Sequence, residues 1–262
     1  MREQRAAIAE ITIRLCDAFS EYKECVRLQE IVWGEDLVVG TSMFVVAHHT
    51  GGQVIGAFDG KDLVGFTMAL AGVRSGEPFL HSHMTAVLPE FRDRGVGRRL
   101  KLFQRHDALK RGIGLVEWTF DPLELKNAYF NLVRLGAVAR RFLPNCYGVT
   151  ESPLHAGLPT DRLVAEWWLD SDRVKNILAD NPLPAKGPVA RISLPSDLGE
   201  IKSKDRESGA RIQSAARKQF QKYFGGGCAA TSVETQGATT DYILEPIAAV
   251  AGLKLREIAE ES

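Results

Sequence analysis

The sequence predicts a mixed α/β protein, with a central and mostly antiparallel sheet and a smaller α/β extension at the C-terminal end. Three observations favour this class. Strand-like and helix-like runs alternate over most of the 262 residues. Asp59-Gly60 joins two strand-like runs in the way typical of a β-hairpin. A turn containing Gly95 and Gly97 then separates a strand-like run from a helix-like run.

The first part of the chain is divided into elements by its apolar periodicity. Strands are expected at 10–15, 53–58, 63–70, 79–88, 115–120 and 137–143, where β-branched and aromatic residues gather between turn signals. Helices are expected at 19–33, near 41–48, at 98–111 and at 123–135. Gly112 and Gly136 are placed where helices commonly end.

Beyond residue 148 the composition changes, because prolines become frequent. One strand is expected at 163–169, followed by a strand at 190–194, a helix at 207–224, and strands at 228–234 and 241–245. A terminal helix is expected at 247–262. We therefore predict a core at 1–148 and an extension at 149–262.

The charge balance limits the classes of partner. Lys plus Arg and Asp plus Glu each number 33, so the formal net charge is zero and no overall field favours nucleic acid or an anionic membrane. No apolar stretch approaches the roughly 20 residues of a membrane span, and the first residues lack a signal-peptide pattern. The four cysteines are scattered, and no His cluster has metal-ligand spacing. We expect a cytoplasmic protein without a metal, a nucleic-acid partner or a membrane partner.

The turn between the fourth strand and the following helix could hold a diphosphate. Unpaired first-turn amides and the helix dipole favour negative charge at such a point, and glycines let the backbone approach a phosphate. The alternative is a plain turn before a surface helix with solvated arginines. A dinucleotide fold is disfavoured because its third glycine would fall at Arg98, and the Gly-Lys-Ser/Thr of a kinase P-loop is absent.

The run Val87-x-Pro89-x-x-Arg92-x-x-Gly95-x-Gly97, followed by Leu100, resembles motif A of the GCN5-related N-acetyltransferase (GNAT) superfamily. The order of elements up to residue 143 resembles that superfamily too. Further runs resemble a bacterial group of predicted GNAT acyltransferases with a C-terminal extension. These runs are 81–97, 118–122, 127–131 and 145–148.

The resemblance implies acetyl-CoA or another acyl-CoA as co-substrate. Its pantetheine arm would lie between two splayed strands, 79–88 and 115–120, and pair with backbone groups freed from the ladder. The pyrophosphate would be held by the loop, and the helix at 123–135 would contact the cofactor. The implied binding residues are Ala86, Val87, Arg92, Arg94, Gly95, Val96, Gly97, Arg98, Asn127 and Asn131.

Transfer to an amine requires a group that accepts the ammonium proton. His81 and His83 are expected on one face of their strand, and their spacing to Val87 resembles that of the arylalkylamine N-acetyltransferases. We favour His83, which is nearer the loop. The alternative is a pair of structural histidines.

Other candidates for the chemistry remain open. Glu117 and Asp121 are alternative bases or amine-binding carboxylates, although Asp121 also suits a turn or cap. The tyrosine that many GNAT enzymes use as acid is replaced by Leu132. Tyr129 or Tyr147 could substitute for it, or a water could.

The predicted function is therefore an N-acyltransferase that moves an acetyl, or a larger group such as succinyl, to the amino group of a small molecule such as an amino acid. The transfer is expected to be direct, in a ternary complex. The alternative is a non-catalytic acyl-CoA binding or sensing module. The resemblance implies an acyl-CoA-binding catalytic core at 1–148, with an extension at 149–262 that could cover the acceptor site or mediate dimerisation. Exposed sheet edges leave a homodimer open. The sequence does not choose the acceptor, the acyl group or the general acid.

Overall fold

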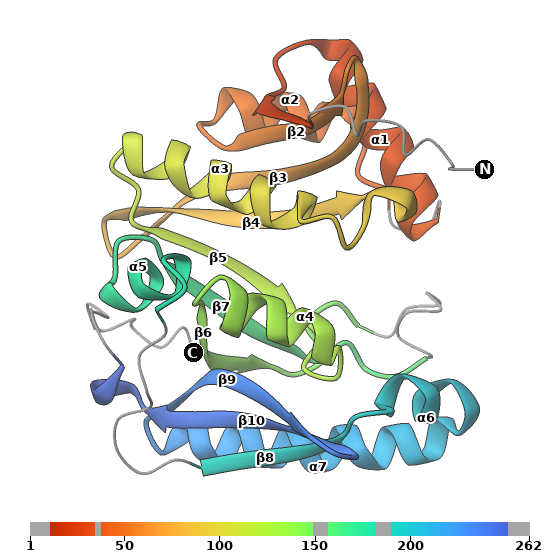
Figure 1. Cartoon of the computed structure of the whole chain (residues 1–262), viewed down its shortest axis with the longest axis vertical. Helices are drawn as coiled ribbons and strands as arrows, with labels where there is room; N and C mark the ends of the chain where they lie inside the picture. Colours follow the sequence, from red (N-terminus) through yellow and green to blue (C-terminus); the bar gives the residue numbers. More distant parts are fainter. Residues whose placement is uncertain (1–10, 35–37, 149–156, 182–189, 251–262) are drawn as a thin grey trace, which may run out of the picture. The chain divides into compact units, whose positions relative to one another are not determined.

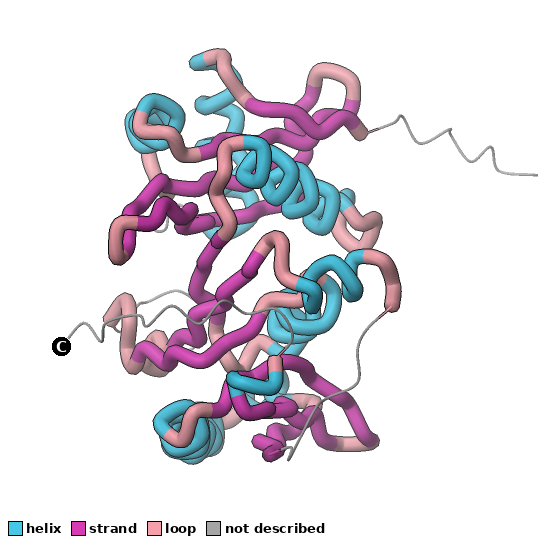
Figure 2. The backbone as a smooth tube through the Cα atoms, turned by 90° about the vertical axis from the view of Figure 1, so that its left-hand side faces the viewer, coloured by secondary structure: helices cyan, strands magenta, loops and turns pink. Residues whose placement is uncertain are grey.

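The computed structural model describes residues 11–34, 38–148, 157–181 and 190–250. The chain divides into two compact units, Met1–Ile113 and Gly114–Ser262. Both units combine strands and helices (Figures 1 and 2). The predicted α/β fold class is confirmed.

The first unit has its strands in the order β1-β2-β3-β4, and each neighbouring pair is antiparallel. The predicted hairpin at Asp59-Gly60 joins β2 and β3, and Gly60 takes the positive φ of 60° that this turn needs. Its strands are β1 (Thr12–Leu15), β2 (Gln53–Asp59), β3 (Asp62–Arg74) and β4 (Glu77–Val87). Its helices are α1 (Phe19–Trp33), α2 (Thr41–His49), the 3-10 turn η2 (Pro89–Phe91) and α3 (Val96–Lys110).

Helices cover both faces of this sheet. Phe66 on β3 contacts the rings of Phe44 on α2 and Trp33 on α1, with ring centroids 5.7 and 6.5 Å apart. The neighbouring Gly65 faces the other way, and a Cβ there would lie 3.5 Å from Leu100 on α3. The side chains of β4 are therefore divided between a face under α1 and α2 and a face under α3.

The second unit has its strands in the order β5-β7-β6-β9-β10-β8, again with antiparallel neighbours. Its strands are β5 (Leu115–Phe120), β6 (Val138–Leu143), β7 (Arg162–Trp168), β8 (Ala190–Pro195), β9 (Cys228–Gln236) and β10 (Thr239–Pro246). Its helices are α4 (Leu125–Tyr129), the π-helical η3 (Phe130–Arg134), α5 (Asp172–Leu178), α6 (Leu198–Lys204), α7 (Arg206–Gly225) and the 3-10 turn η4 (Ile247–Ala249).

The sheet of the second unit continues across residue 148. β7 pairs with both β5 and β6, and β6 pairs with β9 at Ala139 and Ala230. Tyr242 on β10 donates from its hydroxyl to the Pro122 carbonyl oxygen at 2.7 Å. Strands from both sides of the predicted boundary thus share one sheet, and the functional division at 148 stays a prediction.

Most of the expected elements are confirmed with small shifts at their ends, but two expected helices differ and two helices were not expected. The helix expected at 123–135 becomes π-helical from Phe130, with a hydrogen bond from the Leu135 amide to the Phe130 carbonyl oxygen. The helices α5 and α6 were not expected. The expected terminal helix starts as the short turn η4, and its part from 251 onward lies outside the described residues.

Among the described residues, no helix combines the length and the apolar character needed to cross a bilayer.

Candidate active site

The loop between β4 and α3 begins with the turn η2. The Leu88 amide bonds the Val64 carbonyl oxygen of β3 at 2.9 Å, and the Arg92 amide bonds the Pro89 carbonyl oxygen at 3.2 Å. Asp93 and Gly95 then take left-handed conformations, with φ of 58° and 77°. Left-handed residues in such a loop can turn successive N–H groups toward one centre, as in anion-binding nests.

The start of α3 leaves backbone donors available to a ligand. The first hydrogen bond of this helix runs from the Arg99 amide to the Gly95 carbonyl oxygen at 3.0 Å, so the amides of Val96, Gly97 and Arg98 precede the helical ladder. A Cβ built on Gly97 would have no atom within 4 Å. Open space thus lies beside these amides, at the positive end of the helix dipole.

The arginines of this loop differ in what they contact. Arg92 donates from Nε to the Val87 carbonyl oxygen at 3.2 Å, and the Arg94 guanidinium lies 5.4 Å from the ring centre of Phe91. Arg99 is engaged with the Ile11 carbonyl oxygen. Arg98 has a buried Nε for which no partner is found among the described residues.

The end of β4 offers the backbone groups of Val87 rather than those of Ala86. The Leu88 amide bonds Val64 on β3, and alternate residues of a strand direct their backbone groups to opposite edges. Ala86, opposite Phe66, therefore turns its N–H and C=O toward β3, whereas those of Val87 point away from β3. Of the two residues predicted to contact a pantetheine arm, Val87 has the suitable direction.

The two histidines of β4 lie at a β-bulge. Ala69 is opposite Ser82 and Met68 is opposite Met84, so His83 is the extra residue. The rings of His81 and His83 are near each other, with centroids 6.3 Å apart. Without a bulge, residues 81, 83 and 87 would lie on one face of the strand, because their spacings are even. The extra residue shifts this alternation, so the two histidines do not share the face of Val87.

His83 has the properties of a proton acceptor. No hydrogen bond or ion pair of its imidazole is found in the described part of the chain, and the side chain is exposed. The surrounding protein nevertheless displaces part of its hydration, and this desolvation lowers the pKa of His83 below the ordinary histidine value. The neutral form, which can accept a proton, is therefore favoured near pH 7.

Glu117, in the second unit, is held in a buried ion-pair network. Its carboxylate accepts from Arg141 Nη2 at 2.5 Å, and Arg141 Nε donates to Glu166 at 3.1 Å. Arg140 donates to Glu166 at 3.0 Å, and a bulge in β6 brings Arg140 and Arg141 to this network together. Opposite charge at this distance stabilises the carboxylate, which favours a structural role for Glu117.

The helix after β5 separates the two asparagines expected on one face. Asn127 on α4 is exposed, whereas Asn131 in the π-helical segment is 1% exposed. The Asn131 Nδ2 is buried and has no partner among the described residues. Leu132 is fully buried, while Tyr129 is 47% exposed at the end of α4.

Tyr147 and Asp121 have partners within the second unit. The Tyr147 hydroxyl lies 2.8 Å from Thr119 Oγ1 on β5, and the Arg162 guanidinium lies 5.4 Å from the tyrosine ring centre. Asp121 accepts from the Leu123 amide at 2.7 Å, which is the turn role considered for it. Burial raises the pKa of Asp121, against the opposing effect of Lys202.

Sequence reasoning missed Lys101 and Ser82. Lys101 on α3 is buried, and its Nζ donates to Ser82 Oγ at 2.7 Å and to Gln104 Oε1 at 3.0 Å. Desolvation lowers the pKa of Lys101 to about 7. Its position could have been found from the helical spacing. Lys101 lies three and seven residues before Gln104 and Ala108, which places it on the buried face of α3.

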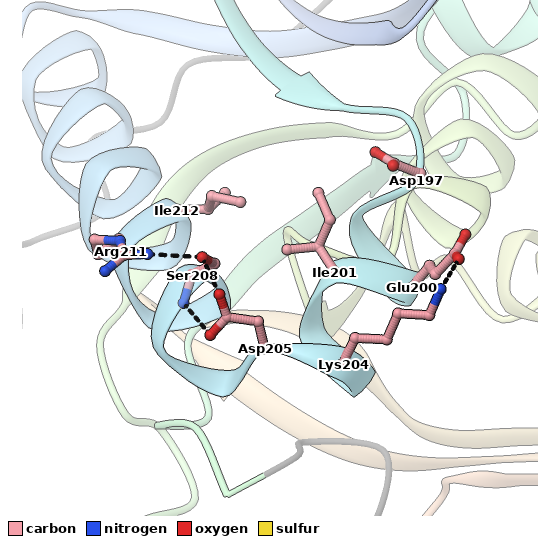
Figure 3. A pocket seen from close by; sticks show the side chains of 8 residues that line it. All are labelled: Asp197, Glu200, Ile201, Lys204, Asp205, Ser208, Arg211 and Ile212. Atoms are coloured by element: carbon pink, nitrogen blue, oxygen red, sulfur yellow. Dashed lines mark hydrogen bonds and ion pairs between the residues drawn. The ribbon is translucent and has the colours of Figure 1, made fainter.

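A pocket of about 570 Å³ between α6 and α7 has no comparable chemistry (Figure 3). Lys204 is paired with Glu200, and Asp205 caps α7 by accepting from the amides of Glu207 and Ser208. Arg211 donates to the Ser208 hydroxyl at 2.7 Å. Each of these charged groups is therefore paired within its own helix or its cap.

The residues of the first unit fit the diphosphate of coenzyme A. The unpaired amides at the start of α3, the open space at Gly97 and the buried Arg98 Nε offer donors to an anion. The outward backbone groups of Val87 could hold an extended amide chain. These features are the ones expected of a protein that binds a coenzyme A thioester.

Two solved structures resemble the chain in fold. One is a candidate acetyltransferase from Acinetobacter baylyi ADP1, with a TM-score of 0.52 and 13% identity over 62% of this chain and 94% of that chain. The other is a protein from Streptococcus mutans UA159, with a TM-score of 0.51 and 17% identity over 61% of this chain and 99% of that chain. No curated protein matches the sequence.

Residues 14–129 match the Acetyltransferase (GNAT) family. This match covers a little under half of the chain, and it includes the motif at Val87 to Leu100 that resembles the GNAT superfamily. The match supports an N-acetyltransferase that uses an acyl-CoA as co-substrate.

Proposed function

We propose that this enzyme transfers an acetyl group, or a larger acyl group such as succinyl, to the amino group of a small molecule such as an amino acid or an amine. The observation that carries the proposal is the arrangement in the first unit, where the loop before α3 follows directly on the strand that carries His83. The proposed binding loop for the acyl-CoA diphosphate and the proposed proton acceptor thus come from one short stretch of chain. The zero net charge favours a small acceptor over a basic protein tail.

The loop would bind the co-substrate through its pyrophosphate. The amides of Val96, Gly97 and Arg98 would donate to phosphate oxygens, and Arg92 and Arg94 would add positive charge. Asn127 and Asn131 stay predicted contacts of the co-substrate, as the resemblance implies, and the Asn131 Nδ2 is buried without a partner among the described residues. When bound, the acyl-CoA supplies the activated thioester.

His83 would act as the general base, and His81 would assist it through their ring contact. An ammonium group cannot attack a thioester, so the acceptor must first lose a proton. The lowered pKa of His83 keeps its imidazole neutral at pH 7, and protonation at lower pH would abolish this role. The kcat/KM should therefore fall as the pH drops through a pKa below the ordinary value of about 6.5.

The proton for the departing thiolate would come from a tyrosine hydroxyl or a water. Leu132 carries no proton to give. Tyr129 is exposed at the end of α4, and the Tyr147 hydroxyl is joined to Thr119 on β5. The variants Tyr129→Phe and Tyr147→Phe would separate these sources, because each removes only a hydroxyl.

The test begins with thermal unfolding in the presence of acetyl-CoA, succinyl-CoA and free coenzyme A. Release of free thiol is then followed with a panel of L- and D-amino acids, arylalkylamines and polyamines. With the best pair, His83→Gln should lower kcat on the order of 100-fold or more while affinity for acyl-CoA stays near that of the parent. The matched control is His106→Gln, which changes an exposed histidine on α3.

Two results would overturn the proposal. Thiol release that requires no amine from the panel would remove the small-molecule acceptor. An unchanged kcat and pH profile in His83→Gln would remove the assignment of the base.

A further inference from the structure

The bulge in β4 is held on both sides of His83. On one side, Ser82 is 4% exposed and its hydroxyl accepts from Lys101 Nζ at 2.7 Å. On the other side, the Met84 carbonyl oxygen accepts from the Thr67 hydroxyl at 3.0 Å. The extra residue is thus fixed by bonds to its two neighbours.

The bulge also decides which way each side chain points. The buried hydroxyls of Thr67 and Ser82 lie 3.5 Å apart, and that of Thr67 lies 2.8 Å from that of Thr85. In regular alternation, Ser82 and Thr85 would lie on opposite faces, since their spacing is odd. The extra residue brings both hydroxyls to the face of α3 and leaves His83 on the side of His81. Loss of the bulge would therefore move His83.

The presence of a lysine at this buried position is costly for the fold. Burial of an ammonium group in a protein interior is unfavourable, and an apolar side chain of similar volume is often at least as stable. The low pKa of Lys101 is the direct sign of this cost. Bulges are enriched next to active sites, where they re-aim a side chain. The lysine is therefore better explained by the geometry that it imposes than by stability.

We propose that Lys101 and Ser82 are positioning residues, which hold the β4 bulge and so set the place and surroundings of the His83 imidazole. This inference rests on the proposed role of His83 as the base. Lys101 itself is buried behind the strand on α3, and it acts on the chemistry through Ser82. Neither residue is part of the motif by which the co-substrate is held.

The experiment compares Lys101→Met and Ser82→Ala with the parent enzyme. Lys101→Met should leave the Tm within a few degrees of the parent, because relief of the buried ammonium offsets the bonds lost to Ser82 and Gln104. Its kcat should nevertheless fall on the order of 10- to 100-fold, with KM for acyl-CoA nearly unchanged, since the base is displaced and the loop is not. Ser82→Ala should give the same loss of kcat, and Ser82→Thr, which keeps the hydroxyl, should restore most of it.

A second measurement does not depend on catalysis. The pKa of His83, followed by NMR of its imidazole, should move toward the ordinary histidine value in Lys101→Met and in Ser82→Ala. The matched control is Lys110→Met, which removes an exposed lysine at the end of the same helix and should leave both readouts unchanged.

The outcomes separate the two proposals. An unchanged kcat and an unchanged His83 pKa in Ser82→Ala would overturn the inference, even if Lys101→Met failed to fold. A shifted His83 pKa in Ser82→Ala, together with a normal kcat in His83→Gln, would instead support the positioning role of Lys101 and Ser82. It would at the same time remove the assignment of His83 as the base.

Discussion

Two β-bulges in this enzyme present polar side chains in opposite ways. In β4 the extra residue is His83, which is exposed and has no polar partner among the described residues. In β6 the extra residue is Arg140, which joins Arg141 in pairing with Glu117 and Glu166. A β-bulge thus leaves the His83 imidazole accessible to solvent in β4, whereas in β6 it brings the Arg140 guanidinium into an ion-pair network.

The difference separates groups that can do chemistry from groups that hold the fold. A base must exchange its proton, which requires access and a pKa near the working pH. A carboxylate between guanidinium groups is stabilised as an anion and contributes by staying charged. The sequence proposes both His83 and Glu117 as candidate bases. Their surroundings favour His83 for proton transfer and Glu117 for a structural role.

The largest expected effect is on the closed network. Glu117→Gln should lower the free energy of unfolding by about 3 kcal/mol, because the buried carboxylate of Glu117 is lost and the half-buried Arg141 keeps only one of its two carboxylate partners. The remaining folded enzyme should keep its kcat. Chemical unfolding in urea measures the first quantity, and thiol release measures the second.

Glu234→Gln is a matched control for this variant, since Glu234 also pairs with an arginine but is exposed. It should change stability by less than about 1 kcal/mol. If Glu117→Gln kept its stability but lost kcat, the contrast between the bulges would fail and Glu117 would return as a catalytic candidate.

An intermediate effect is expected at the open loop before α3. Gly97→Ala places a methyl group in the open space beside the first-turn amides, where no protein atom lies within 4 Å. Stability should be unchanged or slightly higher, since alanine favours helix over glycine by up to about 1 kcal/mol. Affinity for acetyl-CoA should fall about tenfold, because the phosphate can no longer approach the backbone.

Isothermal calorimetry with acetyl-CoA measures this affinity. Gly199→Ala is the matched control, because it lies on a helix and its new methyl group would also meet open space. An affinity equal to that of the parent in Gly97→Ala would show that the diphosphate is not held at this loop.

The smallest effect is expected on the surface of α7. Glu207 pairs with Arg211 one helical turn away, with side chains 83% and 64% exposed. Glu207→Gln should lower the free energy of unfolding by less than about 0.5 kcal/mol, because water screens this pair. A loss in the thermal unfolding curve as large as that of Glu117→Gln would mean that burial is not what distinguishes the β6 network.

The elements with strong local signals could be predicted from the sequence. The ranges of α1 and β5 match their expected bounds, since each has a clear apolar period and a clear end. The π-helical segment after α4 could not be predicted, because no residue type marks it and tertiary packing selects it. The separation of Asn127 from Asn131 was missed for that reason.

The sequence by itself determined the resemblance to the GNAT family and the local structure of the predicted diphosphate loop, because Val87 to Leu100 sets a strand end, a glycine turn and a helix start in one continuous stretch. Such features depend on local backbone conformation and need no distant partner. Only the tertiary structure decided which polar side chains are exposed to solvent and which are paired. The bulge at His83, the Lys101 to Ser82 bond and the pairing of Glu117 with Arg141 join residues 13 to 24 positions apart. Burial and pairing across such separations set pKa and access, and no local pattern encodes them.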